Sequence, residues 1–340
     1  MIFWQGERNS TCRQLFAMKD IFLGTRGSDL ALAQTRMAME LLRHSGFDGG
    51  IQERVIKTSG DVRQDIKLSD FSRVQNGVPE KGVFTKELED ALIAGEIDAA
   101  IHSLKDLPAR LSDGFELVAV LPRAPVEDIL LVKGNACSLN DLPEGATLAT
   151  SSIRRNRIVA WKRPDLLFCD IRGNVPTRLR KLASGQAGDA TILAQAGMER
   201  LGYYHQGSNQ VEIDGSTLGC HVLPKSGFIP AGAQGAVAIE VLAGSPVAGY
   251  LRQINHEDTA IRVAAERKFL HLLGAGCNTP VGVCASFESS NTRMHLEAVV
   301  FEETNPENPP KIGKVCCSRG DVEKMPDELL QVLGIDIQSR

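Results

Sequence analysis

The chain has 340 residues, of which 43% are hydrophobic and 24% are charged. A chain of this size and composition can form two or three hydrophobic cores. Its formal net charge of −4 argues against a dedicated nucleic-acid-binding protein. No uninterrupted apolar stretch of about 18 residues predicts a membrane span. The composition therefore indicates a globular protein that needs neither a nucleic acid nor a membrane as a partner.

From residue 21 onward, short β-like runs alternate with helical patterns. Residues 21–25 predict a strand, and Ser28 or Asp29 can cap the helix that follows. Thr85 begins another predicted helix, which leads to a strand over residues 97–101. Further strand and helix pairs are 147–150 with 153–162, 167–171 with 175–183, and 190–193 with 195–201. This alternation predicts parallel sheets covered by helices.

Other segments depart from the alternation. Residues 60–81 are polar and lack a clear period, so we expect a long mobile loop. Residues 202–229 are rich in glycine and weakly patterned, which indicates a connection that returns the chain between lobes. From about Thr259 a helix opens a smaller unit. This unit contains predicted strands over 281–287 and 295–301 and a final helix over 326–333.

Eight cysteines are scattered along the sequence, and their spacing predicts neither a disulfide framework nor a metal site. None form a Cys-x-x-Cys pair, and no histidine stands at zinc-ligand spacing beside two of them. Residues 1–20 contain Glu7, Arg8 and Arg13 where a signal peptide would have an apolar core. We therefore expect a disordered extension over residues 1–20 and a reducing cytoplasmic compartment.

Positive charge is concentrated in residues 151–181. Nine arginine and lysine residues against two aspartates give this segment a net charge of +7. Since the whole chain carries −4, the remainder carries −11. The asymmetry indicates an anionic ligand held locally. A solvated surface face is the alternative interpretation, but basic residues in the first turn of a helix oppose its dipole and are not explained by stability alone.

Arginine recurs where predicted strands pass into helices. These junctions occur at residues 25–28, 150–155 and 172–174, and Asn174 is the expected cap of the third helix. Helix N-termini offer free N–H groups and partial positive charge, and open α/β sheets bind ligands beyond the carboxyl ends of their strands. Because the planar fork of arginine matches carboxylates and phosphates, three such junctions predict a polyanion site.

Two further motifs offer reactive groups. Asp106 lies in HSLKDLP (102–108), and Cys277 lies in GAGCNTP (274–280). An aspartate before Leu-Pro is most often a turn former, and His102 is more often a packed or hydrogen-bonded residue than a catalyst. A free cysteine is usually buried and inert. Here the glycines beside Cys277 allow another molecule to approach its sulfur closely.

Together these motifs resemble one family closely, the porphobilinogen deaminases, also called hydroxymethylbilane synthases. The resemblance covers most of residues 21–287, and its segments run in family order. They are LGTRGSDLALAQ (23–34), KGVFTKELEDALIAGEIDAAIHSLKDLP (81–108), TSSIRRNR (150–157), IRGNVPTRLRKL (171–182), ILAQAGMERLG (192–202), AGAQGAVAIE (231–240) and GAGCNTPVG (274–282).

The resemblance implies an α/β fold of three domains. Two periplasmic-binding-protein-like lobes have mixed, mostly parallel sheets, and a smaller α+β domain follows them. Domain 1 would comprise residues 21–122 and 232–253, domain 2 residues 123–228, and domain 3 residues 257–340. The family is usually monomeric.

The implied activity is that of a transferase in tetrapyrrole (haem, chlorophyll or cobalamin precursor) biosynthesis. It condenses four porphobilinogen molecules, with loss of ammonia, onto a covalently bound dipyrromethane primer and releases hydroxymethylbilane. No metal is implied.

The resemblance also implies residue roles. Cys277 matches the cysteine that holds dipyrromethane by a thioether bond, and Asp106 matches the catalytic aspartate. Lys81 and Phe84 match the end of the family's mobile loop near the active site. Matches to cofactor- and substrate-binding positions are Arg26, Ser28, Ser103, Lys105, Thr150, Ser151, Ser152, Arg154, Arg155, Arg172, Asn174, Arg178 and Gln234.

The sequence departs from the family pattern at Pro79 and Glu80, which replace a common Gly-Gly, and at Ala233, where many members have glycine. Two alternative functions stay open at this point. One is a two-lobed carboxylate-binding protein without catalysis, which would need an export signal and no special cysteine. The other is a phosphate or nucleic-acid binder using residues 151–181, although few aromatic residues accompany the arginines there.

Overall fold

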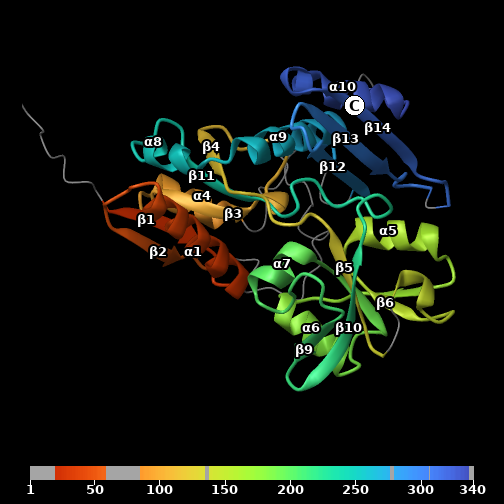
Figure 1. Cartoon of the computed structure of the whole chain (residues 1–340). Helices are drawn as coiled ribbons and strands as arrows, with labels where there is room; N and C mark the ends of the chain where they lie inside the picture. Colours follow the sequence, from red (N-terminus) through yellow and green to blue (C-terminus); the bar gives the residue numbers. More distant parts are fainter. Residues whose placement is uncertain (1–19, 59–84, 135–137, 276–278, 306, 337–340) are drawn as a thin grey trace, which may run out of the picture.

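The computed structural model describes residues 20–58, 85–134, 138–275, 279–305 and 307–336. In these ranges the chain forms three lobes, each built on its own sheet (Figure 1). The expectations for an N-terminal extension, for the 60–81 loop, and for Lys81, Phe84 and Cys277 fall on residues outside this part of the chain. Within it, no helix is both long and apolar enough to cross a membrane.

The first lobe has a five-stranded sheet flanked by helices. Its elements are β1 (Ile21–Thr25), β2 (Ile51–Val55), β3 (Ala99–Ser103), β4 (Phe115–Val120), β11 (Val237–Leu242), α1 (Asp29–His44), α4 (Lys86–Ile93) and α8 (Ala248–Leu251). The strand order is β2-β1-β3-β11-β4. β1 pairs in parallel with β2 and β3, whereas β11 pairs antiparallel with β3 and β4. Four of the five strands therefore point the same way.

The second lobe has a six-stranded sheet in the order β7-β6-β8-β5-β10-β9. Its elements are β5 (Asp128–Val132), β6 (Thr147–Ala149), β7 (Leu167–Cys169), β8 (Ala190–Ala194), β9 (Gln210–Ile213), β10 (Ser216–Leu223), α5 (Ile153–Lys162), α6 (Val175–Ala183) and α7 (Gln195–Arg200). β6 pairs in parallel with β7 and β8, and the remaining pairs are antiparallel. Mixed sheets in both lobes confirm the expected fold class.

Residues 202–229 lead back toward the first lobe as expected, but they also contain regular structure that their weak pattern did not indicate. This segment forms the β9–β10 hairpin, which adds two antiparallel strands to the edge of the second sheet. Asp214 and Gly215 make the turn with φ of 48° and 79°. Asp-Gly is favoured in two-residue hairpin turns because both central positions need positive φ.

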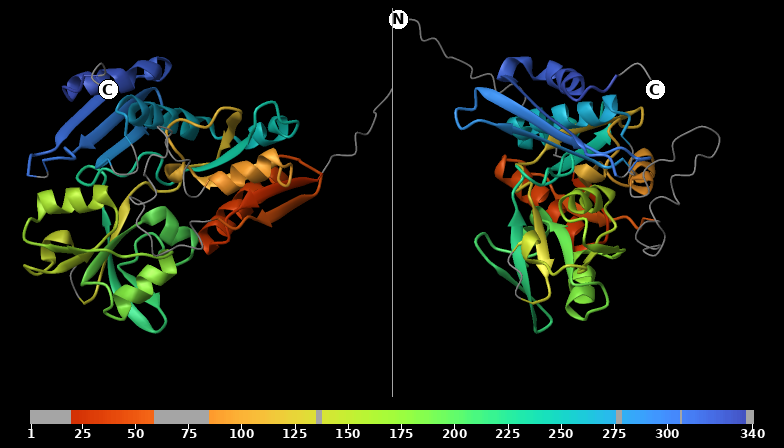
Figure 2. Two further views of the ribbon diagram at one scale, coloured as in Figure 1. Left: turned by 180° about the vertical axis from the view of Figure 1, so that it is seen from behind. Right: turned by 90° about the vertical axis from the view of Figure 1, so that its right-hand side faces the viewer.

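The third lobe is an antiparallel sheet with helices on one face. Its elements are α9 (Glu257–Leu272), β12 (Val281–Phe287), β13 (Arg293–Val300), β14 (Lys311–Ser318) and α10 (Met325–Val332). Side chains alternate between the faces of a sheet. Val283 and Leu296 pack in the core beneath α9 and α10, whereas Cys284 and Val299 pack into a core of the second lobe. Figure 2 shows this sheet lying between α10 and the second lobe.

A buried carboxylate joins the lobes. Glu266 on α9 is fully buried and pairs with Arg123, whose Nη1 lies 2.7 Å from Glu266 Oε1. It also accepts hydrogen bonds from the backbone N–H groups of Ala233, at 2.6 Å, and Ala285, at 2.7 Å. A buried charge must be paired in this way to be tolerated. Ala233 has φ of 60°, a left-handed conformation that glycine adopts more readily than alanine.

Candidate active site

A cleft lies at the carboxyl ends of β1 and β3. Because parallel strands end at the same edge of a sheet, residues far apart in sequence meet there. Ser28 follows β1 and caps α1 by accepting a hydrogen bond from the N–H of Ala31 at 3.3 Å. The 3-10 helix η1 (Leu104–Asp106) follows β3 directly. The polar residues that line the cleft are Arg26, Ser28, Gln34, Thr85, His102, Ser103 and Asp106.

Asp106 projects from a short, well-anchored turn. The flanking side chains of Leu104 and Leu107 are buried, whereas Asp106 itself is exposed. Ser103, at the start of the turn, accepts a hydrogen bond of 2.8 Å from Nε2 of Gln34 on α1. These contacts fix the backbone on both sides of Asp106 and leave its carboxylate open to a ligand. The sequence analysis did not select Gln34 as a supporting residue.

His102 is hydrogen-bonded, as its sequence context favoured. Its Nε2 lies 3.0 Å from Oε2 of Glu240 on β11, and both side chains are buried. Glu240 Oε1 has no hydrogen-bond partner among the described residues. The pair links β3 to β11 close to the end of β3, from which η1 and Asp106 follow.

The opposite wall centres on Asp128, the first residue of β5. Its carboxylate is fully buried and lies 2.8 Å from Arg154 Nη2 and 2.7 Å from Arg155 Nη2. Gln234 Nε2 donates a further hydrogen bond at 3.1 Å. Burial opposes ionisation, but the two guanidinium groups outweigh it and lower the pKa of Asp128 to about 2. Sequence reasoning missed Asp128, whose only signal is an acid at the start of an apolar strand.

The Asp128 network holds Arg154 and Arg155 inside the protein and not at its surface. Both side chains are almost fully buried, and each also donates a hydrogen bond to a backbone carbonyl, of Ile229 at 2.9 Å and of Ile192 at 2.8 Å respectively. They are therefore held rigidly within the second lobe by Asp128 and by these carbonyl groups. Arg154 Nε has no hydrogen-bond partner among the described residues, so one buried donor stays available.

The hydroxyl residues before α5 connect two strand-to-helix junctions. Thr150 Oγ1 accepts a hydrogen bond from the N–H of Ser152 at 3.2 Å, and Ser152 caps α5. Ser151 Oγ donates to the carbonyl of Ile171 at 2.9 Å. The junction after β6 is therefore tied to the segment after β7, from which Arg172 projects. The predicted residues Thr150, Ser151 and Ser152 therefore lie together at this junction, and their hydroxyl groups make hydrogen bonds to nearby backbone groups.

Cations gather at the start of α6. Asn174 caps this helix by accepting from the N–H of Thr177 at 3.0 Å. Arg178 Nε donates to the Gly173 carbonyl at 2.8 Å. Burial and, to a smaller extent, the nearby positive charges of Arg155 and Arg172 together lower the pKa of Arg178 to about 10, whereas Asp106 acts in the opposite direction. Asp106 of the first lobe thus lies within electrostatic range of cations of the second.

Lys105 completes this group of cations. Its side chain as a whole is exposed, whereas its amino group lies among the charges of Asp106 and Arg155. Loss of hydration at the amino group, opposed by Asp106 and supported by Arg155, lowers the pKa of Lys105 to about 8. Six cations therefore stand around two carboxylates, Asp106 and Asp128. They are Arg26, Lys105, Arg154, Arg155, Arg172 and Arg178. The site favours a ligand that carries several negative charges.

Two family models match this chain. The model described as "Porphobilinogen deaminase, dipyromethane cofactor binding domain" matches residues 21–248, and the model described as "Porphobilinogen deaminase, C-terminal domain" matches residues 260–314. The first match alone covers more than half of the sequence.

The chain belongs to the porphobilinogen deaminase family.

Individual family members are similar over most of their length. A porphobilinogen deaminase of Nitrobacter winogradskyi is 44% identical over 76% of this chain and 77% of its own. One of Syntrophomonas wolfei is 40% identical over 93% of this chain and 95% of its own. Among solved structures, a methionine-binding protein, MetQ, aligns with a TM-score of 0.39 and 11% identity, over 73% of this chain and 94% of its own.

The family resemblance stated from the sequence is therefore confirmed, and with it the activity. The chain is a transferase with hydroxymethylbilane synthase activity, and its cofactor is dipyrromethane. The residues present fit such a group, because an acidic oligopyrrole needs several cations and buried polar partners. In addition to the six cations, Gln234, which donates to Asp128, has a buried Oε1 atom without a hydrogen-bond partner among the described residues.

Proposed function

We propose that Asp106 is the catalytic carboxylate of the porphobilinogen deaminase reaction in this chain, and that the cations around it bind the carboxylates of substrate and cofactor. One observation carries the proposal. Asp106 is an exposed carboxylate on an anchored turn, within electrostatic range of Arg178 in the facing lobe. A single acid beside several cations suits a reaction in which a polyanionic ligand briefly develops positive charge.

Binding is divided among three groups of residues. Arg26, Lys105, Arg172 and Arg178 bind carboxylates, because porphobilinogen carries an acetate and a propionate and the growing chain accumulates both. Residues that position the two sides of the site act through the buried Asp128 network, through helix caps or through local hydrogen bonds. They are Ser28, Ser103, Thr150, Ser151, Ser152, Arg154, Arg155, Asn174 and Gln234. Lys81, Phe84 and Cys277 keep the family roles, with Cys277 as the attachment residue.

Asp106 acts at two points of each cycle. Ammonia leaves the aminomethyl group of porphobilinogen, and the Asp106 carboxylate stabilises the pyrrole N–H and the cation that develops. After the new carbon–carbon bond forms, the same carboxylate accepts the proton that leaves the attacking α-carbon. When bound, dipyrromethane supplies the first free α-carbon. Lys105 and Arg178 hold the carboxylates of the reacting molecules, so that Asp106 faces the pyrrole nitrogens.

Domain boundaries at residues 21–122 with 232–253, 123–228 and 257–340 are supported by sheet membership. β11 returns to the first sheet after the second lobe is complete, so two segments cross between these lobes. Two crossings can act as a hinge, and repeated chemistry at one aspartate requires movement of lobes or product. We also propose a cytoplasmic monomer, since five described cysteines are free thiols, which a reducing compartment preserves.

The test replaces Asp106 by asparagine. Asp106→Asn keeps the shape and hydrogen-bonding reach of the side chain but removes its charge and its basicity. We expect the covalent adduct to remain and turnover to fall by about 10²- to 10⁴-fold. Asp113→Asn is the matched control, because the Asp113 side chain is 97% exposed and pairs only weakly with Arg110. Normal turnover of Asp106→Asn would overturn the proposed role.

A further inference from the structure

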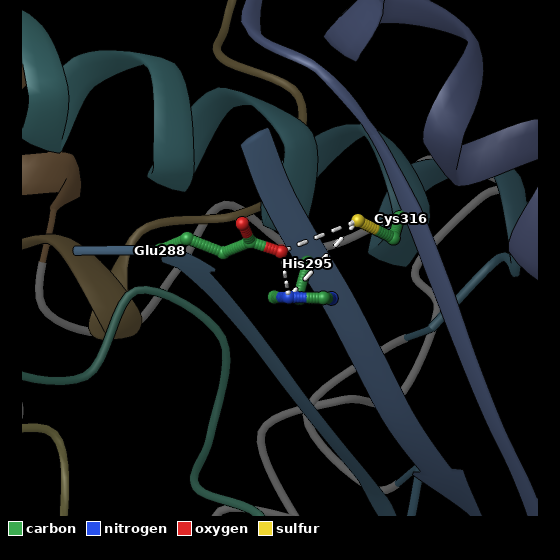
Figure 3. A group of neighbouring side chains, drawn as sticks. All are labelled: Glu288, His295 and Cys316. Atoms are coloured by element: carbon green, nitrogen blue, oxygen red, sulfur yellow. Dashed lines mark hydrogen bonds and ion pairs between the residues drawn. The ribbon is translucent and has the colours of Figure 1, made fainter. Parts of the chain in front are cut away.

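Three metal-ligating side chains converge on the third sheet. Glu288, His295 and Cys316 follow or belong to β12, β13 and β14 respectively. Glu288 Oε1 lies 2.9 Å from His295 Nε2, and Cys316 Sγ lies 4.0 Å from each of these atoms (Figure 3). His295 is paired directly with Cys316 across β13 and β14. Their sequence neighbours Phe287, Met294 and Cys317 pack against the core beneath α9 and α10. Because successive side chains of a strand point to opposite faces, all three candidate ligands lie on the face that these helices do not cover.

The contacts meet at one point. In a charge-relay arrangement, a carboxylate and a thiol would use the two different nitrogens of the imidazole. Here both Glu288 Oε1 and Cys316 Sγ approach the same nitrogen, Nε2 of His295. Three atoms that can each donate a lone pair are therefore directed toward a common centre. This geometry is typical of ligands that share a cation.

The distances are close to those of a tetrahedral zinc site. Zinc–ligand bonds of about 2.0–2.3 Å place ligand nitrogen and oxygen about 3.3 Å apart, and sulfur about 3.5 Å from either. The observed separations are 2.9 Å for the nitrogen–oxygen pair and 4.0 Å for the two sulfur pairs. Each separation needs to change by only about 0.5 Å, which small side-chain rotations provide.

Charge and access also suit a divalent ion. A Cys316 thiolate and the Glu288 carboxylate carry two negative charges, and neutral His295 adds none. The side chains of His295 and Glu288 are 26% and 38% exposed, so an ion can enter from solvent. The mixed nitrogen, sulfur and oxygen donors match the preference of zinc, whereas calcium and magnesium prefer oxygen alone.

We propose that Glu288, His295 and Cys316 form a zinc-binding site with water in the fourth position. None of the three is among the residues proposed for the reaction. The ion would connect the ends of three neighbouring strands and so stabilise the third lobe. His295 Nδ1 has no hydrogen-bond partner among the described residues, and sites without such a partner bind about 10- to 100-fold more weakly. We therefore expect weaker zinc binding than at a site whose histidine has such a partner.

The experiment uses the holoenzyme, freed of metal with a chelator and titrated with Zn²⁺ by calorimetry. We expect one equivalent to bind. Cys316→Ser and His295→Gln should each weaken binding at least tenfold, whereas Cys317→Ser should bind like the parent. Cys317 is the matched control, because it neighbours Cys316 in the same strand but faces the core. No saturable binding, or equal weakening by Cys316→Ser and Cys317→Ser, would overturn the proposal.

Two further readouts separate binding from folding. Zn²⁺ should raise the thermal unfolding midpoint of the parent and of Cys317→Ser, but not that of Cys316→Ser. Co²⁺ in place of Zn²⁺ should produce a thiolate-to-metal charge-transfer band that Cys316→Ser lacks. A midpoint rise or a band that persists in Cys316→Ser would show that the metal binds elsewhere and would refute the site.

Discussion

Replacing Asp128 by asparagine tests the buried centre of the site. The change removes one negative charge and leaves Arg154 and Arg155 buried beside a neutral amide. The pKa of Asp128 is lowered from 3.8 to about 2. At about 1.4 kcal/mol per pH unit, this lowering corresponds to roughly 2–3 kcal/mol of stability. Breaking a buried ion pair by removing one partner typically costs about 3–5 kcal/mol. We therefore expect a loss of about 3 kcal/mol.

The loss should depend on pH in a defined direction. Because the native pKa of Asp128 is depressed, its stabilising contribution is present above about pH 4 and disappears as the pH falls toward about 2. The stability difference between the parent and Asp128→Asn should therefore be full at neutral pH and shrink in acid.

The assay is thermal or urea unfolding of the parent holoenzyme, of Asp128→Asn and of a control variant. Asp214→Asn is the matched control, because Asp214 pairs with Arg180 at 2.7 Å but is 64% exposed. Its φ of 48° is a conformation that asparagine adopts readily. An exposed pair contributes about 0–1 kcal/mol. If Asp128→Asn were no less stable than Asp214→Asn at neutral pH, the Asp128 network would not hold this wall together.

Two further predictions concern Lys105 and Glu266. With a pKa of about 8, Lys105 loses its charge as the pH rises through that value, so the KM for porphobilinogen should increase above pH 8. In Lys105→Arg, which keeps its charge, the KM should not change over the same pH range. An equal increase of KM in both proteins would contradict the carboxylate-binding role of Lys105. Glu266→Gln should destabilise the protein by about 3–5 kcal/mol in urea unfolding, because it leaves Arg123 buried and uncompensated. The control is Glu257→Gln, because the Glu257 side chain is 79% exposed. Similar stability of the two variants would refute the role of Glu266 in joining the lobes.

Local features of this fold were predictable from the sequence. Ser28 and Asn174 precede amphipathic runs, and both cap the expected helices. Such signals act over one helical turn, so tertiary packing does not change them. The β9–β10 hairpin was predictable in principle from Asp214-Gly215, but the surrounding glycines weakened its pattern.

Long-range features were not predictable in this way. The charge pattern indicated Arg154 and Arg155 as ligand-binding residues, but it could not reveal that Asp128 is their internal partner, 26 and 27 residues away. Glu288, His295 and Cys316 were likewise not predicted as metal ligands, because they are far apart in the sequence. Their separations of 7 and 21 residues match no zinc motif, and only the strand register brings them together.

Intact-mass spectrometry of the purified chain tests the central claim most directly, namely that one thiol holds the primer on which Asp106 and its surrounding cations act. The account predicts a mass greater than that of the polypeptide by two pyrrole units. Cys277→Ser should lack this increment and be inactive, whereas Cys169→Ser, which changes a free, half-buried thiol, should keep both the increment and the activity. An unmodified chain with full activity would contradict the account.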